Sequence, residues 1–248
     1  PYLKNIRQLT QDGEFTKAGE AYFSPDGKQI LFQGTKPAHP HYQIYLMNAD
    51  GSGARIVSPG KGKMTCAYFR PGSKTFVYAS THLDKRTYPA PKVPKNPRRR
   101  YKWDYDGSFD IFVGDLETGK ILKRLTTDDG YDAECSYSHD GRAITYTVRR
   151  DKKPDMIWLM NADGSRKRAL IEREDLACGG PFFSPDDKWV LYRGMKPGGR
   201  SMHVYLTSID GETTLKLTTV SRVNWAPFFH PGGEAVAICS PRCLSEST

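Results

Sequence analysis

The chain has 248 residues, of which 38% are hydrophobic and 26% charged, and it carries a formal net charge of +9 at pH 7. Its sequence contains no apolar run near the ~20 residues of a membrane-spanning helix, so we expect no membrane span. The charge is uneven: residues 82–103 hold eight cations and one anion, a net +7 that leaves +2 for the rest. This distribution argues against an extended basic face and against nucleic acid as a partner.

The N-terminal residues show two features. The opening Pro1-Tyr2-Leu3-Lys4 lacks the hydrophobic stretch of a signal peptide, and a start at proline suggests that an upstream segment was removed or left out. Residues 5–10 then have the pattern of a single strand without a hairpin of its own.

A tight turn at residues 22–32 is the first strong signal. Pro25 fixes φ at the second position of the turn, Asp26 favours the third, and Gly27 supplies a positive φ. Apolar residues on both sides predict a β-hairpin. The turn recurs, and we call the position of the proline in each copy the proline slot, which is occupied by Pro25, Pro71, His139, Pro185 and Pro231.

The spacing of the proline slots indicates a true repeat. Successive slots are 46, 68, 46 and 46 residues apart, and 68 is 46 plus 22, so one repeat carries an insertion. A second turn follows about twenty residues after the slot, as Met-Asn-Ala-Asp-Gly-Ser at 47–52 and again at 160–165. Four short strands per repeat of roughly 40–45 residues are typical of a β-propeller blade, and we predict an all-β propeller of four-stranded antiparallel blades.

These turns resemble those of the TolB-like propeller family, whose hallmarks are Phe-Ser-Pro-Asp-Gly-Lys, here at 23–28, and the Met-Asn-Ala-Asp-Gly-Ser turn. The resemblance extends from Leu9 to about Ile238. It implies six blades, a periplasmic or secreted location, and a propeller that binds a protein or peptide partner. The resemblance would also imply a separate N-terminal domain, for which we expect no counterpart in this chain.

We interpret residues 1–248 as a single domain with about four and a half of the six blades. The fifth blade begins at Trp225 and ends at Cys239, and residues 240–248 form a tail without repeat pattern, so we expect a truncated or divergent C-terminal end. The strand at 5–10 would complete the last blade. We expect a monomer.

The insertion at 82–103 lies between the second and third strands of blade two. Four prolines and eight cations leave little apolar surface for packing, so we expect it to be mobile or extended. It is either a solvated loop or a weak polyanion site, because cations alternate with aromatic residues there. The residues that would bind a polyanion are Arg98, Arg99, Arg100 and Lys102.

The innermost strands of a propeller line its central channel, so residues at equal distance from the proline slot form a ring. Five residues before the slot, this ring contains two glutamates, and neighbouring positions add polar and aromatic groups. Convergent polar groups of this kind predict a binding site, whereas the alternative is that they only bind water and cap loop amides. The predicted ligand-binding residues are Glu20, Asp132, Glu134, Asn224 and Trp225.

A catalytic role finds less support. The sequence has no Gly-x-Ser-x-Gly elbow, no metal-ligand triad and no cofactor motif, so we expect neither metal nor cofactor. The sequence therefore favours a non-catalytic binding propeller of the cell envelope. The alternative is the propeller portion of a peptidase-like hydrolase or a lyase whose catalytic part is missing from this chain.

Overall fold

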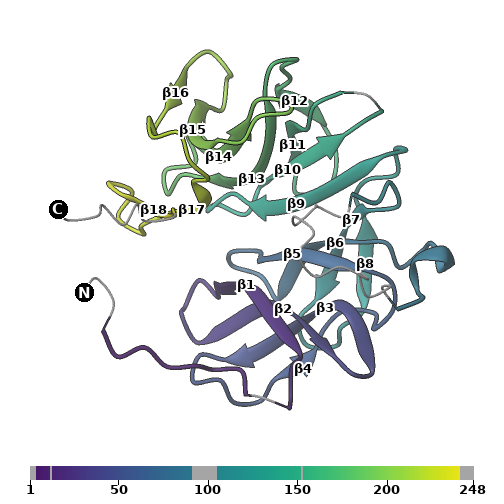
Figure 1. Ribbon diagram of the computed structural model, residues 1–248. Coiled ribbons are helices and arrows are strands. Elements are labelled where there is room, and N and C mark those ends of the chain that lie inside the picture. Colours follow the sequence, from purple (N-terminus) through teal and green to yellow (C-terminus); the bar gives the residue numbers. More distant parts are fainter. Residues whose placement is uncertain (1–3, 12, 91–104, 152, 241–248) are drawn as a thin grey trace. The chain divides into compact units, whose positions relative to one another are not determined.

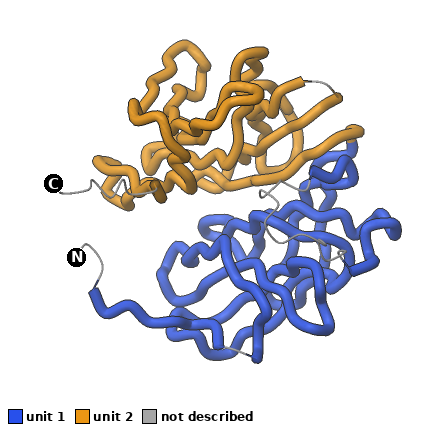
Figure 2. Tube along the Cα trace, in the orientation of Figure 1, with its two compact units in different colours: residues 1–127 blue, residues 128–248 orange. Residues whose placement is uncertain are grey.

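The computed structural model of the chain describes residues 4–11, 13–90, 105–151 and 153–240 (Figure 1). The regular structure of this part of the chain is β-strand apart from one short 3-10 helix, Lys85–Thr87. Two compact units divide the chain at residue 127, and each is described by itself (Figure 2). The predicted all-β class is confirmed.

Unit 1 contains two four-stranded antiparallel sheets, in which the strands follow each other in chain order. The first sheet consists of β1 (Lys17–Phe23), β2 (Gln29–Lys36), β3 (His39–Asn48) and β4 (Arg55–Ile56). The second sheet consists of β5 (Met64–Phe69), β6 (Thr75–Ser80), β7 (Asp110–Asp115) and β8 (Ile121–Arg124).

Unit 2 contains two further sheets of the same kind and one sheet of two strands. The first comprises β9 (Tyr131–Tyr137), β10 (Ala143–Arg149), β11 (Met156–Asn161) and β12 (Arg168–Ile171). The second comprises β13 (Ala177–Phe183), β14 (Trp189–Met195), β15 (Met202–Ser208) and β16 (Thr214–Lys216). The last sheet pairs β17 (Trp225–Phe229) with β18 (Val236–Cys239).

A four-stranded meander of consecutive antiparallel strands is the blade of a β-propeller. The structure therefore confirms the predicted propeller fold, with four complete blades and a two-stranded fifth sheet in the described residues. Its last strand ends at Cys239, where the repeat pattern also ends.

The repeated turn is held by its own side chains. In blade one, Ser24 Oγ donates to Asp26 Oδ1 at 2.6 Å, while the backbone N–H of Lys28 and of Gln29 donate to Asp26 and Ser24 at 3.1 and 2.9 Å. The Ser24 hydroxyl lowers the pKa of the Asp26 carboxyl. Gly27 has a φ of +70°, as the turn requires.

Apolar side chains between neighbouring blades form the cores. In unit 1, Leu31 and Ile44 of blade one pack with Phe69 and Tyr78 of blade two, all at most 4% exposed. In unit 2, Ile157 of blade three lies in one cluster with Phe183, Val190 and Tyr192 of blade four. Within each unit, the blades are thus stabilised mainly by the apolar area that they bury against each other.

The N-terminal segment differs from the prediction. Residues 4–11 form no strand, and so the strand predicted at 5–10 is wrong. The segment instead runs along blade one, where Arg7 Nη2 donates to the carbonyl oxygen of Asp50 at 3.1 Å. Leu9 packs beside the cluster around Phe15 and Tyr45. Side-chain contacts with blade one, not strand pairing, hold this segment.

The start of the basic insertion is packed, and the expectation of a mobile or extended loop is wrong for residues 82–90. His82 and Thr87 are 4% and 7% exposed, and Asp84 caps the short helix by accepting from the backbone N–H of Arg86. The Tyr88 hydroxyl donates to the His82 carbonyl oxygen at 2.7 Å. These contacts secure the point where the insertion leaves β6.

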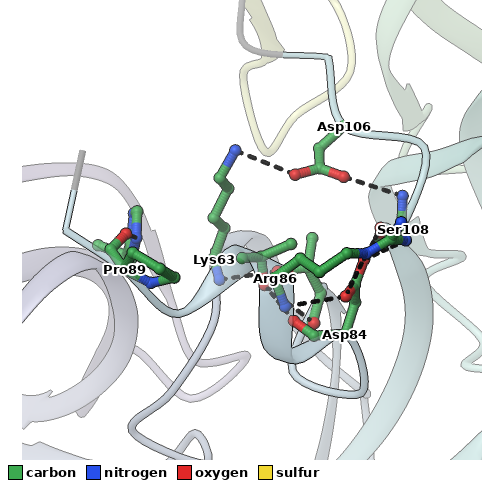
Figure 3. A network of polar contacts seen from close by, with 9 residues as sticks. Lys63, Asp84, Arg86, Pro89, Asp106 and Ser108 are labelled. Carbon is green, nitrogen blue, oxygen red and sulfur yellow. Dashed lines mark hydrogen bonds and ion pairs between the residues drawn. The ribbon is translucent and has the colours of Figure 1, made fainter. Parts of the chain in front are cut away.

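A polar network joins the start of the insertion to residues 105–108, which follow it (Figure 3). Ser108, just before β7, donates its hydroxyl to Asp84 Oδ2 at 2.7 Å, and Arg86 forms an ion pair with the same carboxylate at 2.8 Å. Asp106 pairs with Lys63 at 3.0 Å, which ties the segment before β7 to the start of β5. Residues 91–103, which include the predicted polyanion residues Arg98, Arg99, Arg100 and Lys102, lie outside the described residues.

Candidate binding site at the bulged inner strands

Each innermost strand has a β-bulge at the same point of the repeat. The pairing of β1, β5, β9, β13 and β17 with the second strand of the blade shifts register there. One residue of each bulge lies five residues before the proline slot, and we call this the bulge position. It has a φ of +47° to +59° in all five copies, which are Glu20, Cys66, Glu134, Gly180 and Ala226.

A left-handed backbone conformation costs an L-residue about 1–2 kcal/mol. Four of the five bulge positions are not glycine, so the surrounding structure must hold them in place. A bulge also breaks the alternation of a strand and thereby changes the direction in which a side chain points. The bulges therefore set the direction of two carboxylates, Glu20 in unit 1 and Glu134 in unit 2.

Glu134 links blade three to blade four. Its Oε2 accepts from the backbone N–H of Gly180 at 2.6 Å and from Thr147 Oγ1 at 3.0 Å. Its Oε1 accepts from Arg193 Nη2 at 2.6 Å. The side chains of Glu134 and Arg193 are only 11% and 13% exposed, so this ion pair is largely shielded from water.

Arg193 continues the contact to blade five. Its guanidinium carbon lies 4.5 Å from the centroid of the Trp225 ring, in a cation–π arrangement. Glu134, Arg193 and Trp225, which we call the Arg193 clamp, thus connect three successive blades of unit 2. Glu134 and Trp225 were predicted, whereas Arg193 was missed.

A signal for Arg193 was present in the neighbouring strand. Gly179 and Gly180 follow each other in β13, and a Cβ atom on either one would collide with the Arg193 guanidinium. The Glu134 carboxylate would also lie within 2.7 Å of a Cβ on Gly179. A glycine pair inside an innermost strand can therefore mark space kept for a large side chain from the adjacent strand.

Asp132 and Asn224 are buried in unit 2, where they form hydrogen bonds with neighbouring groups. Asp132 is fully buried, and its Oδ1 accepts from Arg150 Nη1 at 2.9 Å. Asn224 is 3% exposed and donates its Nδ2 to the carbonyl oxygen of Met202 at 2.9 Å. Both side chains stabilise their own surroundings and are not part of the proposed site.

Glu20 occupies the corresponding bulge position in unit 1, where its surroundings are more open. The residue is exposed, and its Oε2 accepts from the Tyr22 hydroxyl at 3.4 Å and from Cys66 Sγ at 3.5 Å. The rings of Tyr22 and Tyr68 meet edge to face with centroids 5.2 Å apart. We call Glu20, Tyr22, Cys66 and Tyr68 the Glu20 site.

The described residues contain no group of three or more His, Cys, Asp or Glu side chains arranged to hold a metal ion. No helix among them is long and apolar enough to cross a membrane.

Comparison with known proteins finds partial sequence similarity and a shared fold. No family model matches the chain. Among curated proteins, the Tol-Pal system protein TolB of Francisella tularensis subsp. mediasiatica is 27% identical over 86 residues, which are 35% of this chain and 19% of that protein. This chain therefore matches only a small part of its curated relative.

Among solved structures, TolB from Acinetobacter baumannii superposes with a TM-score of 0.64 and 22% identity over 87% of this chain and 46% of that one. An oligogalacturonate lyase in complex with manganese superposes with a TM-score of 0.61 and 15% identity over 91% of this chain and 59% of that one. The fold is thus shared by TolB and by a lyase, and it does not by itself define a function. The fold of this chain is that of a TolB-like β-propeller.

Proposed function

We propose that this chain is a non-catalytic binding propeller of the cell envelope, which binds a protein or peptide partner through its bulged innermost strands. The observation that carries the proposal is the shared bulge position. Five successive copies keep a left-handed residue there, and in Glu20 and Glu134 that strain directs a carboxylate. Strained backbone of this kind concentrates at binding sites.

The residue types around the bulges also suit an interface. Trp225 is partly exposed, and tryptophan is among the residues that most often anchor a bound protein. Carboxylates accept charge-assisted hydrogen bonds from the donors of a partner. Catalysis would need a nucleophile with its base or a separated acid–base pair, and Glu134 is instead bound to Arg193.

The names of the relatives suggest where the partner is found. The curated relatives are named as TolB of the Tol-Pal system, and we propose that the partner is another protein of such a system. By the same resemblance we propose a periplasmic location.

Calorimetric titration of the purified chain with each Tol-Pal system protein of the same organism tests this proposal. We expect one of them to bind, and Trp225→Ala to weaken that binding by at least about tenfold, the loss typical of an interface anchor. Trp225→Phe is the matched control, because it keeps an aromatic ring against Arg193. Failure of every component to bind contradicts the proposal, and turnover of a peptide or oligogalacturonate that Glu134→Gln abolishes would favour the enzyme alternative.

A further inference from the structure

Two residues of unit 2 depart from the repeat. The proline slot is proline in four copies, but it is His139 in blade three. The residue two positions after the slot is glycine or serine in four copies, but it is Asp187 in blade four. Asp187 nevertheless has the left-handed backbone of a turn glycine, with a φ of +57°. A residue in this conformation persists only where its surroundings hold it.

The two departures contact each other across the junction of blades three and four. Asp187 Oδ1 accepts from the backbone N–H of His139 at 2.7 Å, and Oδ2 accepts from that of Asp140 at 2.9 Å. The Nδ1 atom of the His139 ring lies 3.1 Å from Asp187 Oδ1. The carboxylate thus binds the turn of blade three through both of its oxygen atoms, in hydrogen bonds that its charge strengthens.

A proline at the slot could not make this contact, because proline has no N–H to donate. The next junction shows the same two positions with other residues. A Cβ atom on Gly233 would lie 3.6 Å from Pro185 Cγ, so glycine packs against proline between blades four and five. His139 and Asp187 therefore form a polar pair where the next junction has an apolar one, and we call this pair the His139–Asp187 clasp.

The clasp continues a line of polar contacts that starts on β9. Glu134 accepts from the backbone N–H of Gly180 at 2.6 Å, and the buried Ser136 hydroxyl donates to the Pro181 carbonyl oxygen at 2.8 Å. His139 follows three residues after Ser136 and adds the contact with the turn of blade four. A displacement of β9 along β13 would break these contacts together.

We infer that Asp187 is a positioning residue for the proposed site. Through the clasp with His139, it holds β9 in the position at which Glu134 reaches Arg193. The inference rests on the proposed function only in that Glu134 belongs to the proposed site.

Reversal of both departures to the residues of the repeat tests the clasp. In the wild-type background, Asp187→Gly removes the carboxylate, and we expect the Tm in scanning calorimetry to fall by about 3 °C or more. In a His139→Pro background the contacts from His139 are already lost, so Asp187→Gly mainly relieves backbone strain and should leave Tm unchanged or raise it. The effect of glycine on the unfolded chain is the same in both backgrounds and cancels. A difference below about 2 °C between the two backgrounds overturns the inference.

Hydrogen exchange provides a second measurement that does not need the proline variant. Asp187→Asn keeps the shape of the side chain but removes its charge and one acceptor. Asp186→Asn is the matched control, because the neighbouring Asp186 bonds within its own turn. We expect Asp187→Asn to speed exchange of the Gly180 amide, which donates to Glu134, by about tenfold relative to the control.

Equal exchange of this amide in Asp187→Asn and in the control overturns the inference. Neither measurement uses a partner, so the two proposals fail separately. Failure of the clasp leaves the proposed function standing, and a chain that binds no Tol-Pal protein can still show the clasp.

Discussion

The two units place a glutamate at the same position of the repeat in very different surroundings. Glu134 is 11% exposed and bound to Arg193, whereas Glu20 is exposed and has Ala79 at the equivalent position of the second strand. The backbone is nevertheless the same, with φ values of +53° and +48°. The bulge fixes where the carboxylate points, and the residue across the sheet decides whether an arginine of the next blade encloses it.

The same contrast appears among the aromatic residues two positions before the proline slot. Phe69, Tyr137 and Phe183 are 1–5% exposed, while Phe23 of blade one is 64% exposed. Equal sequence patterns thus contribute unequally to stability, because burial depends on whether another blade packs against the aromatic ring.

The largest expected effect is that of removing the guanidinium in unit 2. Arg193→Ala leaves Glu134 as a shielded carboxylate without its cation, and we expect a loss of about 3–5 kcal/mol in the free energy of unfolding. Urea unfolding followed by circular dichroism measures it. Arg193→Lys is the control that keeps the charge and should lose less. A loss below about 1 kcal/mol in Arg193→Ala would show that the clamp does not stabilise unit 2.

A paired substitution tests the contrast in burial. Phe183→Ala should destabilise the chain by about 3 kcal/mol, because it opens a cavity between blades three and four. Phe23→Ala should change the free energy of unfolding by less than about 1 kcal/mol, since little apolar area is lost at an exposed site. Similar losses in the two variants, measured by the same urea titration, would mean that the aromatic of blade one is covered in solution.

Acidification should affect unit 1 through His82. Burial, together with the positive charges of Lys61 and Arg124, lowers the pKa of this histidine from 6.5 to about 4. The unfolded chain then takes up the proton first, so stability that is complete above pH 6.5 is lost as the pH falls towards 4. We expect a loss of about 1–3 kcal/mol over this range.

Thermal unfolding between pH 7 and pH 4 measures this loss. His82→Gln is the reference variant, because it removes the titrating imidazole. The comparison is between the pH dependences of the two proteins, so it holds even if the substitution itself changes stability. The same dependence on pH in wild type and His82→Gln would assign the effect to other groups.

The smallest expected effect on stability is that of Glu20→Gln. We expect a change within about 0.5 kcal/mol in the free energy of unfolding, as for most exposed substitutions. Differential scanning calorimetry of this variant beside Glu134→Gln gives the direct comparison of the two bulge positions. A large loss for Glu20→Gln would mean that Glu20 supports unit 1 as Glu134 supports unit 2.

The sequence by itself was sufficient for the architecture, because the repeat depends on local chemistry. The turn at Ser24–Gly27 is closed by side chains two and five residues apart, so its residues are recognisable wherever they recur. A 46-residue step between such turns implies the blade, and the step of 68 located the insertion between β6 and β7.

What only the tertiary structure decided depends on contacts between distant residues. Arg193 reaches Glu134 across 59 positions of the chain, and no local pattern shows that blade four supplies an arginine there while blade two supplies an alanine. Likewise, Ser108 contacts Asp84 across 24 residues, and this contact helps to order the start of the insertion despite its charge. Residues 5–10 have the composition of a strand, but a strand needs a paired neighbour, and the tertiary contacts of Arg7 and Leu9 place the segment against blade one instead.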